Sequence, residues 1–172
     1  MSTSLYDLSV GSYLQIVEGA NNVMGKGAEH CGAQGINLAE VVAASLYEDM
    51  APLHFQAVAV AHHSMGAVRG IQAGEFAPPS GYGDMDYAGL QNLLASTLDE
   101  LKALNADDIN ALSGGKVIFK IGGNEIPFTT ENFILSFSLP NFYFHATTLY
   151  DILRQQGVPL GKMDFLGPLK IG

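Results

Sequence analysis

The segment from residue 51 to residue 71 limits the fold more than any other part of this chain, because a helix built from it is apolar on nearly every side. Its apolar residues include Leu53, Phe55, Val58, Val60, Ala61, Met65 and Val68. A helix without a polar face is buried by its neighbours rather than placed at a surface. Pro52 falls in the first turn, where a missing backbone N–H costs little. The segment therefore predicts a central helix covered by other helices.

Three further segments show helical patterns. Residues 4–28 carry apolar side chains at three- and four-residue steps, which is one face of an amphipathic helix. Asn37 is a good helix cap, and a short helix is expected after it over residues 38–47. A clean apolar stripe predicts another long helix over residues 87–104. These helices are expected to cover the central helix and bury its apolar side chains.

Two segments between the predicted helices are predicted to form a loop and a hairpin. Residues 73–86 hold adjacent prolines and several glycines, so they are expected to form a long crossover loop. Residues 116–121 and 125–128 are rich in β-branched and aromatic side chains on either side of a Gly-Gly-Asn turn, which predicts a small β-hairpin.

The last helix is expected to begin at a threonine cap, Thr129 or Thr130, and to end at Gly157. Pro140 should kink or split it, since proline lacks a backbone donor and crowds the preceding turn. The fold predicted from all these segments is all-α. It is a four-helix bundle with a long crossover loop and a small β-hairpin before the last helix, in one domain over residues 1–172.

Charge and cysteine content exclude several classes of protein. The formal net charge is −9, and the eight basic residues are scattered, so neither nucleic acid nor an anionic membrane is an expected partner. Cys31 is the only cysteine, which rules out an internal disulfide and fits a reducing, cytoplasmic location. The first residues lack the pattern of a signal peptide, and no apolar run is long enough to span a membrane. A soluble protein is expected.

His145 is the main candidate for a functional residue. It lies four residues from both Asn141 and Leu149, so the three side chains share one face of the last helix. A buried imidazole there needs a hydrogen-bond partner, which a backbone carbonyl or a polar side chain such as Asn141 or a tyrosine can supply. The other interpretation is a metal ligand or general base. As ligand-binding residues we predict His145, Asn141 and Tyr143.

His62 and His63 are adjacent, and a helix rotates by about 100° per residue, so only one of them can point fully inward. His54 is eight residues from His62, or about 12 Å along the helix axis, which is too far for both to bind one ion. The candidate metal ligands are therefore His62 or His63 together with His145. Such a set provides two nitrogens where a stable zinc site needs three or four.

Residues 145–158 resemble the last-helix motif of the DinB/YfiT-like superfamily, in which a His-x-x-x-His pair precedes Leu-Arg-x-x-Gly-Ile/Val. The matching residues are His145, Leu153, Arg154, Gly157 and Val158. Asn141 replaces the first histidine, and residues 146–148 replace the Arg-Gly-Gln step of the family. The whole chain, including residues 49–53 and 161–167, resembles an uncharacterised subfamily of this superfamily.

The resemblance implies a four-helix bundle, often dimeric, with a divalent metal such as nickel or zinc bound by one histidine of the second helix and two of the last. It also implies thiol-dependent transfer or isomerisation in some relatives. Two hypotheses follow for this chain. One is a non-enzymatic or metal-depleted homodimer that binds a small ligand in a cavity lined by His145, Asn141 and the second helix. The alternative is a divergent metal-dependent enzyme of the thiol-dependent transferase or hydrolase type.

Overall fold

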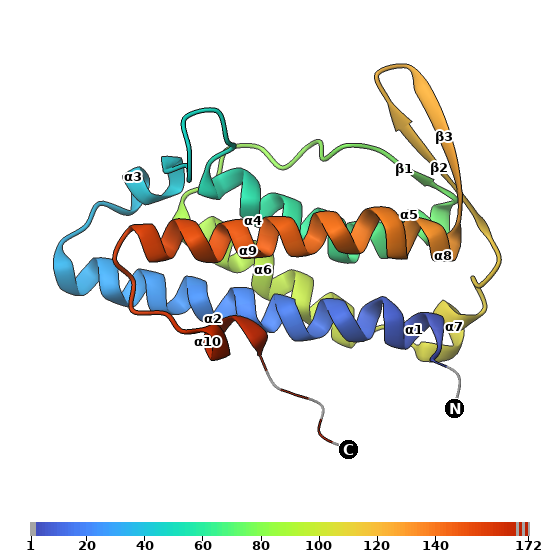
Figure 1. Ribbon diagram of the computed structural model, residues 1–172, viewed down its shortest axis with the longest axis horizontal. Helices are drawn as coiled ribbons and strands as arrows, with labels where there is room; N and C mark the ends of the chain where they lie inside the picture. The colour runs from blue at the N-terminus through green and yellow to red at the C-terminus, as the bar shows by residue number, and fades with distance from the viewer. Residues whose placement is uncertain (1–2, 168, 170, 172) are drawn as a thin grey trace.

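The computed structural model describes residues 3–167, 169 and 171, and most of them lie in helices (Figure 1). The other residues of the predicted 1–172 domain lie outside this description. The helices, with π-helical turns labelled η, are α1 (Leu5–Leu8), α2 (Val10–Gln34), α3 (Leu38–Ala43), α4 (Leu53–Ala61), η1 (His62–Gly66), α5 (Ala67–Ala73), α6 (Tyr87–Lys102), α7 (Ala106–Asn110), α8 (Thr130–Phe133), η2 (Ile134–Ser138), α9 (Leu139–Gln155) and α10 (Lys162–Leu166). None of the helices in the described part of the chain combines the length and the apolar character that a membrane crossing requires.

The long helices pack side by side along one direction (Figure 1). α2 contacts α6 and α9, and α4 contacts the same two helices from the other side. The predicted central helix is therefore confirmed in α4, which has buried residues all around it. Its N-cap is Pro52, one residue before the first turn.

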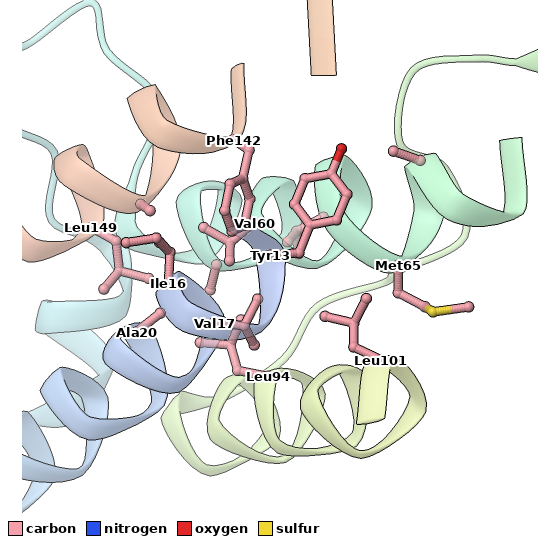
Figure 2. Packing of buried hydrophobic residues seen from close by; sticks show 14 of the residues in the cluster. Tyr13, Ile16, Val17, Ala20, Val60, Met65, Leu94, Leu101, Phe142 and Leu149 are labelled. Atoms are coloured by element: carbon pink, nitrogen blue, oxygen red, sulfur yellow. The ribbon is translucent and has the colours of Figure 1, made fainter. Parts of the chain in front are cut away.

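The core lies where these helices meet (Figure 2). Tyr13 of α2 and Phe142 of α9 are both fully buried, and their rings meet edge to face with 5.1 Å between centroids. Val60 of α4 and Leu94 of α6 are also fully buried and complete the contact from the other two helices. Each large apolar side chain buried in this way contributes about 1.5–3 kcal/mol to the free energy of unfolding. The core therefore ties all the long helices together.

The predicted hairpin is present, but it belongs to a larger sheet. Strands β2 (Lys116–Ile121) and β3 (Asn124–Thr129) are antiparallel, and the glycines of the turn, Gly122 and Gly123, both have positive φ. A two-residue turn with positive φ at both positions suits glycine. A third strand, β1 (Glu75–Phe76), pairs in parallel with β2. The all-α prediction is thus corrected to a mostly helical fold with a three-stranded sheet, because the predicted crossover loop begins as a strand.

The last helical segment is continuous from Thr130 to Gln155 and is not split at Pro140. The predicted cap is confirmed, since the Thr129 side chain accepts a hydrogen bond from the backbone N–H of Asn132. The turn just before Pro140 is the π-helical turn η2. A π turn changes the spacing of backbone donors and acceptors, and here it accommodates a proline that would interrupt regular α-helical hydrogen bonding.

Helix α10 lies against the outer side of α2 (Figure 1). Gly19 makes the close approach possible, because a Cβ atom at this position would lie 2.1 Å from the backbone oxygen of Phe165. The Gln15 amide donates to the backbone oxygen of Leu166 at 2.9 Å. Lys26 pairs with Asp164, with 2.5 Å between nitrogen and oxygen. Backbone contact and charge pairing together hold the segment in place.

Candidate functional site

Two histidines from different helices meet between η1 and α9. The ring centroids of His63, in η1, and His145, in α9, lie 5.8 Å apart, and the ring planes differ by 13°. His63 is 7% exposed and His145 is half-buried. Of the two adjacent histidines in the second helix, His63 is therefore the one that faces His145. We call these two residues the histidine pair.

Both helices that supply the histidine pair contain a π-helical turn, and one buried hydrogen-bond chain connects them. Ser138, at the end of η2, donates from its hydroxyl to the backbone oxygen of His63 at 2.7 Å. The Tyr13 hydroxyl lies 2.6 Å from the same Ser138 oxygen and donates to it, because the serine proton is already used. This hydrogen-bond chain connects α2, η1 and η2 next to the histidine pair. π-helical turns are frequent at functional sites because they reposition side chains.

His145 is held by a glutamine of α4. Its Nδ1 lies 2.7 Å from the side-chain oxygen of Gln56. The rings of Phe55 and Phe144 stand edge-on to the imidazole, with centroid distances of 5.7 Å and 5.2 Å. Burial lowers the pKa of His145 to about 4. At neutral pH the ring is therefore uncharged and has one nitrogen lone pair.

His63 is surrounded by rings instead of polar partners. Phe76 and Phe137 each lie 5.7 Å from it, measured between ring centroids. Among the described residues, its Nδ1 is the only buried side-chain nitrogen or oxygen without a hydrogen bond. Burial, together with the nearby rings of His62 and His145, lowers the pKa of His63 to about 3. An orphaned buried nitrogen is uncommon in a folded protein and requires an explanation.

His62 faces the other way, toward the segment after α5. Its Nε2 donates to the backbone oxygen of Ala77 at 2.8 Å, and its ring packs on Phe76 at 4.5 Å. Burial lowers the pKa of His62, and the bond to Ala77 partly offsets this. A surface cavity of about 470 Å³ is lined by His62 together with Arg69 and Tyr82. His62 therefore belongs to the crossover side of the helix and not to the histidine pair.

The two other predicted ligand-binding residues are placed differently. The Asn141 side-chain nitrogen donates to the backbone oxygen of Phe137 at 2.7 Å, so its amide group is engaged by its own helix. Tyr143 is 41% exposed, and its ring packs against Phe142, 5.6 Å away, and not against His145. The structure thus brings His63 and His145 together and leaves Tyr143 outside the pair.

His54 and Cys31 lie outside the histidine pair. His54 accepts a hydrogen bond at Nε2 from the backbone N–H of Met85, at 3.2 Å. Cys31 is fully buried in α2, and burial raises the pKa of its thiol, which disfavours the reactive thiolate. Within the described ranges, no three His, Cys, Asp or Glu side chains gather closely enough to hold a metal ion.

Comparison with known proteins places this chain in a family. A family model described as a domain of unknown function, DUF1993, matches residues 5–166. The chain belongs to the DUF1993 family. A solved structure similar to this DUF1993 domain is that of a DinB family member protein from Shewanella denitrificans. It has a TM-score of 0.82 and 24% sequence identity, and the match covers 98% of this chain and 94% of the other. No curated protein matches the chain. The prediction of an uncharacterised family is therefore confirmed, and so is the prediction of a fold like that of a DinB family member.

Sequence reasoning missed one residue of the candidate site. Gln56 is 1% exposed and contacts His145, yet it was not predicted. A signal was available, because Gln56 precedes His63 by seven residues in an otherwise apolar segment, and this spacing puts two side chains on nearly the same face of a helix. A polar residue at that position indicates a buried partner.

Proposed function

We propose that this DUF1993 domain is a cytoplasmic, homodimeric four-helix bundle that binds a small ligand at the histidine pair without a resident metal and without a catalytic role. The observation that carries the proposal is a pair of neighbouring imidazoles, His63 and His145, in which the buried Nδ1 of His63 has no hydrogen-bond partner among the described residues and the Nδ1 of His145 is held by Gln56. Its partly apolar surroundings, which include Phe55 and Phe144, are typical of small-molecule sites with a few polar groups.

The donor set does not fit the metal site that the DinB-like resemblance implies. That site takes two histidines from the last helix, whereas this chain has His145 and Asn141 there. The Asn141 amide is bonded to Phe137, and a neutral amide is a poor ligand for zinc or nickel compared with imidazole. His63 and His145 alone provide two of the three or four ligands that a stable zinc site needs.

Exposed aromatic side chains support the homodimer. Phe55 of α4 is 38% exposed and Phe144 of α9 is 56% exposed, and both flank His145. Aromatic residues are enriched in protein interfaces. Analytical ultracentrifugation of Phe144→Ser should show a monomer if this surface forms the dimer. Tyr47→Ser, at a 64% exposed aromatic residue between α3 and α4, is the matched control and should remain dimeric.

Metal analysis of the full chain, purified without chelators after growth with several divalent metals, tests the absence of a resident metal. We expect far less than one ion per chain and the same melting temperature with and without EDTA, since a metal bound to the folded state would raise the stability. The same metal analysis of His145→Ala shows whether any bound metal depends on this histidine.

The alternative is a divergent divalent-metal-dependent enzyme of the thiol-dependent transferase or hydrolase type. The unpartnered Nδ1 of His63, in a ring stacked near His145, is the observation that favours it. One bound zinc or nickel ion per chain, lost in His145→Ala, would overturn the metal-free proposal and support this alternative.

A further inference from the structure

Both polar atoms of the Gln56 side chain have hydrogen-bond partners. It lies in the apolar helix α4 and is 1% exposed. A buried amide must satisfy its oxygen as well as its nitrogen, because an unpaired buried polar group is costly. The two partners of Gln56 therefore define which way its amide points.

The amide nitrogen of Gln56 donates to the backbone oxygen of Ala51 at 2.8 Å. A carbonyl oxygen can only accept, so turning the amide over would place two oxygens against each other. The side-chain oxygen must then face His145, whose Nδ1 lies 2.7 Å away. Because the amide oxygen also can only accept, the proton of the neutral imidazole must sit on Nδ1.

We propose that Gln56 is a positioning residue that fixes His145 in the Nδ1–H tautomer, so that its Nε2 accepts a hydrogen bond from an N–H or O–H group of the ligand. This inference rests on the proposed small-ligand function and names the class of ligand. Nε2 has no hydrogen-bond partner among the described residues, and the half-buried ring leaves this atom accessible. A carboxylate or an ether oxygen, which can only accept, has no favourable contact with this nitrogen.

The aromatic side chains next to His145 indicate the chemistry of the remaining part of the ligand. The rings of Phe55 and Phe144 both lie against the imidazole of His145 in T-shaped arrangements, with centroid distances of 5.7 Å and 5.2 Å. His63 stacks against the same imidazole. These aromatic neighbours favour a small and mostly apolar molecule with one O–H or N–H donor, and phenol is the simplest probe of that class.

The tautomer is measured directly by ¹⁵N NMR of the full chain labelled at histidine, near pH 7. Wild type should show a protonated Nδ1 and an unprotonated Nε2 at His145. Gln56→Met, which keeps the side-chain length and removes the acceptor, should show a mixture of tautomers. Gln56→Glu keeps an acceptor oxygen and should restore the Nδ1–H form while raising the pKa of His145. Gln72→Met, on the exposed side of α5, is the matched control and should resemble wild type.

Three probes then test the ligand class. Phenol should shift the Nε2 signal of His145, whereas anisole and benzoate, which have the same ring without a neutral donor, should not. In Gln56→Met the affinity for phenol should fall by about two- to fivefold, because only the fraction of protein with the correct tautomer can bind.

The outcomes separate this inference from the proposed function. Mixed tautomers in wild type, or an unchanged tautomer in Gln56→Met, overturn the role of Gln56. Equal shifts with phenol and anisole overturn the donor requirement. A fixed tautomer with no response to phenol overturns this ligand class. A bound metal at His145 would instead overturn the metal-free function, and metal analysis detects it independently of the NMR experiment.

Discussion

The two faces of the helix formed by α4, η1 and α5 hold their histidines under opposite conditions. On the face toward the crossover segment, His54 and His62 each form a hydrogen bond with a backbone atom, of Met85 and Ala77 respectively. On the face toward α9, His63 has a buried Nδ1 without a partner among the described residues. Histidines on the first face fasten a segment of chain. The second face retains a group that costs stability, which is typical of a functional site.

The largest expected effect concerns the hydrogen-bond chain behind the α9 face. Ser138→Val should lower the free energy of unfolding by about 3 kcal/mol, because it leaves both the backbone oxygen of His63 and the Tyr13 hydroxyl buried without partners. Tyr13→Phe is the control and should cost about 1 kcal/mol, since Ser138 still donates to His63. Urea denaturation measures both variants. If both variants lost the same free energy of unfolding, the hydrogen bond from Ser138 would not stabilise the backbone at His63.

The second effect is a pH dependence of stability. The pKa values of His63 and His145 are about 3 and about 4 in the folded protein, below the ordinary value of 6.5. Between pH 6.5 and 4 the unfolded chain binds more protons than the folded one, so the free energy of unfolding falls as the pH falls. We expect a loss of about 2 kcal/mol across this window, allowing for partial exposure of the site. Denaturation at a series of pH values measures it.

A variant pair assigns that pH dependence to one face of the helix. His63→Leu should flatten the fall in stability between pH 6.5 and 4, because it removes the histidine with the lowest pKa. His62→Gln should leave most of the fall in place, since the pair remains intact. The opposite result would place the acid-sensitive group on the crossover side.

The smallest expected effect is a change in the free energy of unfolding at pH 8 that has opposite signs in two variants. His63→Leu should raise the free energy of unfolding by about 1 kcal/mol, because it removes an unpartnered buried nitrogen. His62→Leu should lower it by about 1 kcal/mol, because it removes the hydrogen bond to Ala77. Two adjacent residues of the same type would then respond in opposite directions. Equal decreases in the free energy of unfolding of both variants would contradict the proposed difference between the two faces.

Local signals in the sequence were sufficient for most of the helices. Asn37 and Thr129 cap helices as predicted, because capping depends on residues two or three positions away. Strand β1 was not predicted, since it has two residues and is defined by pairing with Ile118 and Phe119, more than forty positions away. Pairing between distant segments leaves little trace in a local pattern.

The candidate site was predicted in part. The position of His145 followed from its spacing to Leu149, and the structure places both on the inner side of α9. The choice between His62 and His63 could not be made, because it depends on a π-helical turn that no simple sequence pattern announces. Gln56 could have been found from its spacing to His63, since a polar residue within an apolar helix requires a partner.

The contact between Gly19 and the segment around Phe165 also constrains how the chain is made. The hydrogen bond from Gln15 to Leu166 connects positions 151 residues apart. During synthesis the outer side of α2 must remain uncovered until α10 has left the ribosome, because α10 covers it. A nascent chain that stops before α10 therefore presents a bare strip of α2 to chaperones and to other nascent chains.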